Sequence, residues 1–291
     1  MQEWRDIHFT ARDGLRLYAR HYPAPGSSRR PVLCLAGLSR NSRDFHRLAM
    51  ALEAPGSGTG RDVYTLDSRG RGLSERDPDW KSYSVLVELG DALDFMTAKA
   101  LHGAAVIGTS RGGLLAMMMA VLRPSAVGAA VLNDIGPVIE REGLARIVAY
   151  IGRIPVPSDW DEATRIVHEM HRRHFPAVPA EEWAEQARAW FNEDGNGLPA
   201  PGYDRNLARS FALSDEPIPE LWPQFGALAQ VPVLAIRGEH SDILSAKTLE
   251  EMRVRHPRLD VFTVRGQGHA PLLRDSPTQS AIQAFLARSD G

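Results

Sequence analysis

The feature that most constrains the fold is a serine set among glycines between two apolar runs. Ser110 follows a short run at residues 104–107 and precedes a longer run, rich in Ala and Met, at residues 114–122. The first run has the length of a strand, and the second is typical of a buried helix. Gly108 and Gly112 leave room for a sharp strand-to-helix turn that would expose the serine hydroxyl above a helix N-terminus. That end of a helix presents free N–H groups to developing negative charge. The pattern predicts a nucleophilic serine, and the alternative is a chance glycine-rich turn.

Composition narrows the class of protein. The 291 residues are 43% hydrophobic, which is enough for a large core. The net charge of −2 does not indicate a nucleic acid or an anionic membrane as partner. The single cysteine, Cys34, cannot form an internal disulfide, and the N-terminus lacks a signal-peptide pattern. No apolar run approaches the roughly 20 residues of a membrane span. We expect a cytoplasmic protein whose partner is a small molecule.

Strand and helix patterns alternate along most of the chain. The strands are largely apolar on both faces, which favours a mostly parallel eight-stranded sheet with helices on both faces. Asp13 and Gly14 separate the first two strands and predict a hairpin. The eight expected strands lie at residues 7–10, 15–19, 31–36, 63–66, 104–107, 129–132, 231–236 and 259–264.

The pattern changes after residue 136. No good strand can be assigned between residues 138 and 228, where Pro, Gly and Asp clusters separate helical stretches. We predict a helical lid, residues 137–229, inserted into a core domain formed by residues 1–136 and 230–291. The expected helices of the lid lie at residues 140–152, 159–174, 179–191, 204–213 and 218–225.

A nucleophilic serine needs a base, and a histidine base needs a carboxylate that fixes its tautomer. His269 lies in a glycine-flanked loop after the last strand, and Asp242 lies in the loop after the preceding strand. Because both loops leave the C-terminal ends of parallel strands, they are expected at the same sheet edge as Ser110. The chain order Ser110, Asp242, His269 is that of α/β-hydrolases.

With these motifs together, the chain resembles the α/β-hydrolase fold superfamily, of the lidded serine esterase and lactonase type. The resemblance implies Ser110 as nucleophile, His269 as general base and Asp242 as the acid that orients it. It also implies an oxyanion hole formed by the backbone N–H groups of Leu38 and Arg111. The motifs that carry the resemblance lie at residues 35–38, 67–74, 108–113, 238–242 and 266–269.

The oxyanion loop departs from the family pattern at one position. Such proteins usually have a histidine before the glycine of this loop, and here the residue is Ala36. The backbone amide of Leu38 can still donate, but an imidazole that could bond the neighbouring backbone is missing.

Several side chains allow two interpretations. Asp134, after the strand that precedes the lid, is the alternative acid, and its other interpretation is a turn or helix-cap aspartate. Asp242 is preferred because its loop matches the family better. The guanidinium of Arg111 would form a salt bridge with Glu88 or Asp91, and the alternative is contact with an anionic substrate.

Other polar residues are expected to be structural. Asp67 and Arg69 resemble a structural turn, and His240 would line the loop that carries the acid. The lid sequence also contains three closely spaced histidines, for which a partly exposed helix face is preferred over a metal site. These histidines are His168, His171 and His174.

The chemistry implied is that of a serine hydrolase acting on a small carboxylic ester, lactone or thioester through an acyl-enzyme on Ser110. This chemistry requires no cofactor and no metal. A carbon–carbon bond hydrolase, a hydroxynitrile lyase or a cofactorless peroxidase could use the same residues. A non-catalytic small-molecule receptor is the remaining alternative.

Overall fold

The computed structural model describes residues 3–53, 60–210 and 218–290. One eight-stranded sheet runs through it in the order β1-β2-β4-β3-β5-β6-β9-β10. The first two strands form an antiparallel hairpin, β2 also pairs antiparallel with β4, and all other neighbours are parallel. The predicted mostly parallel eight-stranded sheet is therefore confirmed. The strands are β1 (Arg5–Thr10), β2 (Arg16–Tyr22), β3 (Val32–Leu35), β4 (Val63–Asp67), β5 (Ala104–Thr109), β6 (Val127–Asn133), β9 (Val233–Gly238) and β10 (Leu259–Val264).

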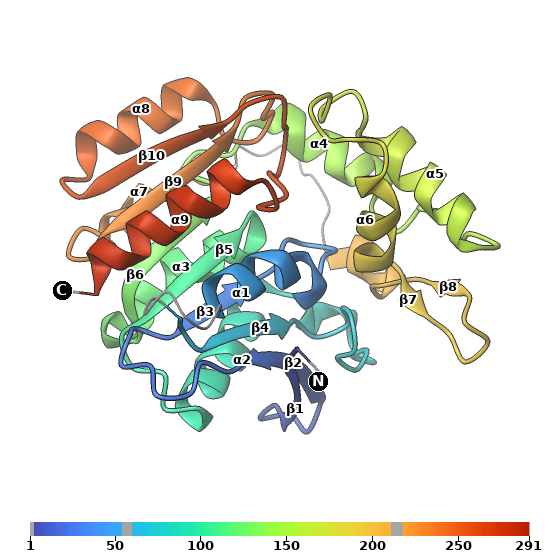
Figure 1. Ribbon diagram of the computed structural model, residues 1–291, viewed down its shortest axis with the longest axis horizontal. Coiled ribbons are helices and arrows are strands. Elements are labelled where there is room, and N and C mark those ends of the chain that lie inside the picture. The colour runs from blue at the N-terminus through green and yellow to red at the C-terminus, as the bar shows by residue number, and fades with distance from the viewer. Residues whose placement is uncertain (1–2, 54–59, 211–217, 291) are drawn as a thin grey trace.

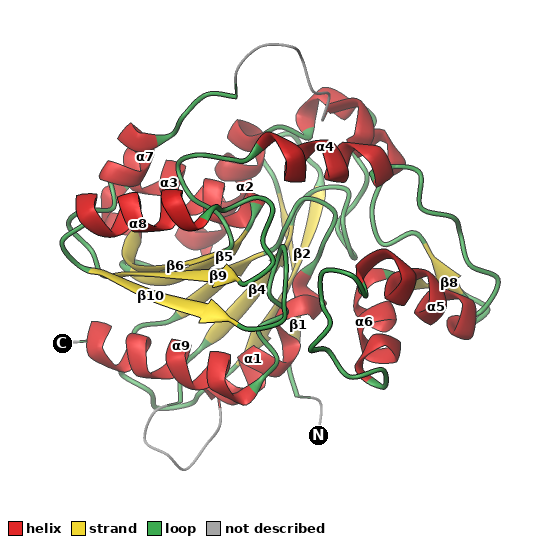
Figure 2. Ribbon diagram, turned by 90° about the horizontal axis from the view of Figure 1, so that it is seen from above, coloured by secondary structure: helices red, strands yellow, loops and turns green. Residues whose placement is uncertain are grey.

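Helices cover both faces of the sheet (Figure 2). On one face lie α1 (His46–Glu53), preceded by the 3₁₀ turn η1 (Ser42–Phe45), and α9 (Ser276–Ser289). The other face carries α2 (Val85–Ala98), α3 (Arg111–Leu122), α7 (Trp222–Gly226) and α8 (Ala246–Arg255). No helix in these described parts of the chain is both long and apolar enough to cross a membrane.

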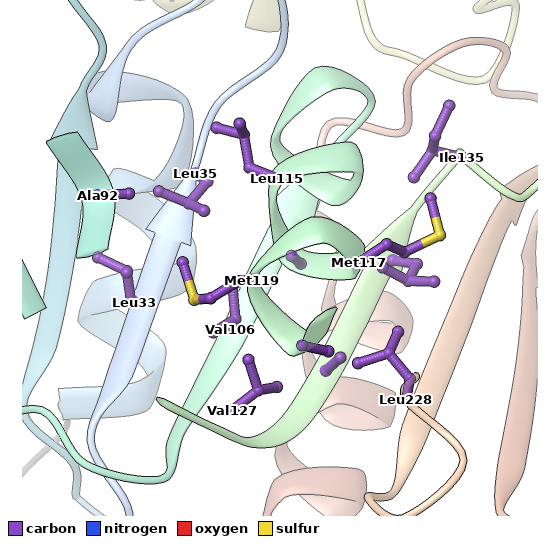
Figure 3. Packing of buried hydrophobic residues seen from close by; sticks show 14 of the residues in the cluster. Leu33, Leu35, Ala92, Val106, Leu115, Met117, Met119, Val127, Ile135 and Leu228 are labelled. Carbon is purple, nitrogen blue, oxygen red and sulfur yellow. The ribbon is translucent and has the colours of Figure 1, made fainter. Parts of the chain in front are cut away.

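The helix that follows Ser110 is buried against the centre of the sheet. Met119 of α3 lies near Leu33 on β3 and Val106 on β5, and all three are inaccessible to solvent (Figure 3). The same cluster continues through Leu115 to the side chains of α2. Because α3 is packed on several sides, the turn at its N-terminus is held in a fixed position relative to β5.

The segment between β6 and β9 contains most of the remaining helices, and we refer to residues 137–229 as the insert. Figure 1 shows α5, α6 and the small β7–β8 hairpin at the side of the molecule, away from α8 and β10. Two of its elements differ from the prediction. No strand was expected in this segment, but β7 and β8 form a hairpin, and the fourth expected helix is a 3₁₀ helix, η4. Residues 211–213 of that expected helix lie outside the described residues. The elements are α4 (Arg141–Tyr150), α5 (Trp160–His171), α6 (Glu182–Trp190), β7 (Asn192–Glu193), β8 (Pro199–Ala200), η4 (Arg205–Ser210) and α7, which packs on the sheet where a helix at residues 218–225 was expected.

Helix α6 is attached to the loop that follows β3. Asn41 donates from Nδ2 to the carbonyl oxygen of Ala189 at 2.9 Å. Arg43 donates to the same oxygen at 3.1 Å and to the carbonyl oxygen of Phe191 at 3.2 Å. The last carbonyls of a helix lack partners within the helix, and a cation there also complements the helix dipole. The end of α6 is therefore fixed beside the loop that carries Leu38.

We expect the packing of α3 to dominate its contribution to stability. Leu115 and Leu122 are on the same helix, but Leu115 is 2% exposed and Leu122 is 61% exposed. Leu115→Ala should lower the free energy of unfolding by about 2 to 5 kcal/mol because it leaves a cavity. Leu122→Ala should change it by less than about 0.5 kcal/mol. Urea denaturation of both variants measures the difference, and equal losses would contradict this packing.

Candidate active site

Ser110 is located in a sharp turn between β5 and α3. Its backbone has φ 50° and ψ −113°, a conformation that costs energy for any residue other than glycine. A Cβ atom on Gly108 would lie 2.3 Å from the carbonyl oxygen of Gly112, and one on Gly112 would lie 2.0 Å from that of Leu35. Only glycine allows the strand and the helix to approach this closely. The turn predicted from the sequence is therefore present.

A chain of hydrogen bonds connects three side chains at this edge of the sheet. His269 Nε2 lies 2.9 Å from Ser110 Oγ, and His269 Nδ1 lies 2.8 Å from Asp134 Oδ2. Ser110 follows β5, Asp134 follows β6 and His269 follows β10. A base that contacts a hydroxyl and is itself oriented by a third group is the arrangement that activates a serine.

The structure corrects the prediction that Asp242 contacts the imidazole. Asp242 instead forms a two-point ion pair with Arg146 of α4, with Nη2 2.8 Å from Oδ1. Burial tends to raise the pKa of Asp242, but the Arg146 guanidinium outweighs burial and lowers it. The position beside His269 belongs to Asp134, because β6 lies between β5 and β9 in the sheet.

The carboxylate of Asp134 is completely buried and fully paired. Besides His269, it accepts a hydrogen bond from the backbone N–H of Gly238 at 2.7 Å and one from Ser241 Oγ at 2.6 Å. A buried carboxylate requires such partners. The segment at residues 238–242, which was expected to supply the carboxylate for His269, instead supplies hydrogen-bond donors to Asp134. The sequence feature that could have identified Asp134 is its place directly after β6, the strand next to β5.

Two backbone amides near Ser110 are available for an oxyanion. Those of Leu38 and Arg111 donate to no acceptor in the described part of the chain. The loop before Leu38 lies close to the serine, since a Cβ atom on Gly37 would be 3.8 Å from Ser110 Cβ. The other amide belongs to the first residue of α3, where free N–H groups are expected.

A buried ionic chain links the residues that carry these two amides. Arg71 donates from Nε to the carbonyl oxygen of Leu38 at 2.8 Å and from Nη1 to Glu88 at 2.7 Å. The second oxygen of Glu88 accepts from Arg111 Nε at 2.6 Å, which confirms the predicted salt bridge. Burial would raise the pKa of Glu88, but the two guanidiniums outweigh it and hold the pKa low. Arg71 supplies a bond to the loop of Leu38 of the kind that an imidazole at Ala36 could have made, and this contact was not predicted from the sequence.

The family model described as "alpha/beta hydrolase fold" matches residues 30–275. The chain belongs to the α/β-hydrolase family. It is 34% identical over 280 residues to the 3-hydroxybutyrate-oligomer hydrolase of Cupriavidus necator, covering 92% of each chain. It is 28% identical to the 2-(acetamidomethylene)succinate hydrolase of Mesorhizobium japonicum, covering 82% of this chain and 81% of that one.

The crystal structure of an α/β hydrolase from Novosphingobium aromaticivorans is similar to this structure over almost its whole length. The TM-score is 0.91 at 37% sequence identity, and 99% of each chain is covered. Together with the hydrolases among its relatives, this likeness shows that the protein is an enzyme, a hydrolase of the α/β superfamily.

The other residues considered in the sequence lie outside the reacting centre of the hydrolase. Asp67 accepts hydrogen bonds from the backbone N–H groups of Ser42 and Leu73, and Arg69 forms an ion pair with Asp91, as expected of a structural turn. His240 is exposed. No group of three His, Cys, Asp or Glu residues in the described ranges is arranged to hold a metal ion.

A cavity adjoins Ser110 and His269, and its wall comes from both the core loops and the insert. His171 lies in this wall and is 7% exposed, which corrects the expectation of partial exposure for this residue, whereas His168 and His174 are partly exposed as predicted. Its ring contacts the rings of Trp183 and Trp190. Burial, followed by the charge of Arg40, lowers the pKa of His171 to about 3. The imidazole is therefore neutral near pH 7.

This low pKa predicts a pH dependence of stability. In the unfolded chain His171 takes up a proton near pH 6.5, whereas in the folded chain it does so near pH 3. Its contribution to stability is complete above pH 6.5 and is lost as the pH falls towards 3. Over that window His171→Phe should flatten the fall in unfolding free energy by up to about 1.4 kcal/mol per pH unit. Urea denaturation from pH 7 to 4 measures both slopes, and identical slopes would show that folding does not lower the pKa of His171.

Proposed function

We propose that this hydrolase cleaves a small carboxylic ester, or a related lactone or thioester, through an acyl-enzyme on Ser110. The proposal is carried by the continuous hydrogen-bond chain from Ser110 Oγ through His269 to the buried carboxylate of Asp134. A serine hydroxyl is a weak nucleophile at neutral pH, and an imidazole in direct contact with it provides the base.

Each residue has a defined part in the reaction. As Ser110 Oγ attacks the carbonyl carbon, its proton moves to His269 Nε2, and the carbonyl oxygen becomes an oxyanion. The N–H groups of Leu38 and Arg111 stabilise that oxyanion. His269 then gives the proton to the leaving alcohol, and the acyl group stays on Ser110. Water, deprotonated by His269, releases the acid and restores the serine.

Asp134 orients the imidazole and stabilises the imidazolium that forms. Its own orientation is fixed because Gly238 and Ser241 bind it while His269 Nδ1 donates to it. The salt chain from Arg71 through Glu88 would position the two oxyanion amides relative to each other. In this account the catalytic acid is Asp134, and Asp242 anchors α4.

The insert would serve as a lid over this site, and the division into a core domain and a lid domain stays a prediction. The support is that His171, Trp183 and Trp190, all from the insert, line the cavity beside Ser110. Aromatic walls exclude water and strengthen the polar interactions within the site.

The relative from Cupriavidus necator supports an ester as substrate. It is named for hydrolysing oligomers of 3-hydroxybutyrate. Hydroxy acids join through their hydroxyl and carboxyl groups as esters, so the reaction in its name fits an acyl-enzyme on a serine.

Ser110→Ala tests the proposal. The variant should lose turnover of a short-chain p-nitrophenyl ester by on the order of 10⁶-fold, because no other group can form the acyl-enzyme. A fluorophosphonate probe should label Ser110 in the wild-type enzyme and leave the variant unlabelled. Unchanged ester turnover would eliminate the serine mechanism. Absence of labelling in folded wild-type protein would favour a non-catalytic receptor instead.

The assignment of the acid is tested by two matched substitutions. Asp134→Asn should lower kcat by about 10⁴-fold, because the amide favours the wrong imidazole tautomer. Asp242→Asn should lower it less than about tenfold, since it removes only a partly exposed ion pair. The two variants differ from the wild type by the same atoms, so stopped-flow ester hydrolysis compares them directly. The reverse order of losses would return the role to Asp242.

A further inference from the structure

Two polar atoms in the cavity wall have no hydrogen-bond partner in the described part of the chain. They are Arg40 Nη1 and His171 Nε2, and both are buried. A buried donor or acceptor without a partner costs stability, so native proteins contain few of them. Both residues line the cavity that also contains Ser110 and His269, so a molecule bound in this cavity can supply the missing partners.

The guanidinium of Arg40 is held rigidly by its other contacts. Asp44 accepts from Nε at 2.7 Å and also from Nη2. The orientation of the Gln186 amide that suits its neighbours places its oxygen 2.7 Å from Arg40 Nη2 and 2.9 Å from Trp190 Nε1. The guanidinium also stacks 3.8 Å above the Trp190 ring. Two of its three nitrogens are therefore occupied, and Nη1 is the one left for a ligand.

His171 provides a neutral partner near two guanidiniums, Arg40 and Arg146, which are paired with Asp44 and Asp242. The side-chain charges that act most strongly on it come from Arg40 and Arg146, followed by His174 and His269, and all of them disfavour its protonated form. Arg40 reaches the cavity from the loop after β3, and His171 reaches it from the end of α5. The subsite is thus shared between the core and the insert.

The ligand group that fits these atoms best is a carboxylate. Its two oxygens can accept from Arg40 Nη1 and from the protonated Nε2 of a neutral imidazole, and a hydrogen bond between a carboxylate and a guanidinium is among the stronger ones. A hydroxyl could bond both atoms, but its hydrogen bond to the guanidinium would be weaker than that of a carboxylate.

We propose that Arg40 and His171 form a carboxylate-binding subsite, so that the preferred substrate is an ester whose acyl or alcohol part carries a second, ionised carboxylate. This inference rests on the proposed ester hydrolysis at Ser110.

The test compares each anionic ester with its neutral partner. One set contains the monomethyl esters of succinic, glutaric and adipic acids beside the dimethyl esters. The other contains acetyl esters of short hydroxy acids beside their methyl esters, which places the carboxylate in the alcohol part. Initial rates in a pH-stat give kcat and KM for each, and the readout is the ratio of kcat/KM, anionic to neutral.

The wild-type ratio should exceed one for at least one pair. Arg40→Gln should lower that ratio about tenfold or more, mainly through KM of the anionic ester, as expected for loss of a charged hydrogen bond. Arg40→Lys should retain part of the preference, and His171→Phe should also lower the ratio. The neutral ester corrects for any disturbance of folding or of α6.

Arg47→Gln is the matched control. Arg47 lies on α1 and binds Glu185 of α6 at 3.0 Å, but it is not part of the cavity wall. Its removal deletes the same charge near the same helix and should leave the ratio unchanged.

If p-nitrophenyl ester turnover depends on Ser110 but no pair favours the anion, or if Arg40→Gln leaves the ratio unchanged, the subsite is overturned and the proposed function stands. If that turnover persists in Ser110→Ala, the proposed function fails first.

Discussion

The site depends on one buried carboxylate that joins three loops. Asp134 follows β6, accepts from the backbone of the last residue of β9 and from a hydroxyl of the loop after it, and holds the histidine that follows β10. A buried charge is tolerated only when every oxygen is paired, so the three loops are held together. The reach of His269 across two strands to Ser110 follows from this arrangement. The same carboxylate that would orient the base therefore also organises the edge of the sheet.

A second buried carboxylate, Glu88, fixes the residues that carry the amides of Leu38 and Arg111, as Asp134 fixes the imidazole. It pairs with Arg71, which holds the carbonyl of Leu38, and with Arg111 at the start of α3. Pre-organised donors are effective because they need not reorient when charge develops. The two carboxylates together fix His269 and the residues that carry the amides of Leu38 and Arg111, the groups to which we assign the roles of base and oxyanion donors. Arg40 and His171 line the same cavity, one from the core and one from the insert, and in our proposal they select the substrate.

Local patterns in the sequence predicted the sheet, its opening hairpin and the turn at Ser110, because strand periodicity and glycine sterics act over a few residues. The salt bridge of Arg111 to Glu88 was also predictable, since both lie near the start of a helix in the expected layer. The choice between Asp242 and Asp134 was not, because it depends on how far each loop turns towards its neighbour. Arg146 of α4, distant in the sequence, takes Asp242 away from the imidazole. The burial of His171 likewise depends on how α5 and α6 pack, which periodicity alone does not fix.

The most direct test of the central claim is a crystal structure of the enzyme after reaction with a small alkyl fluorophosphonate, which leaves a tetrahedral adduct resembling the acyl-transfer intermediate. We predict phosphorus bonded to Ser110 Oγ, the phosphoryl oxygen within hydrogen-bond distance of the amides of Leu38 and Arg111, and His269 still bound to Asp134. An adduct on another residue, an oxygen turned away from both amides, or an imidazole held by Asp242 would contradict the account.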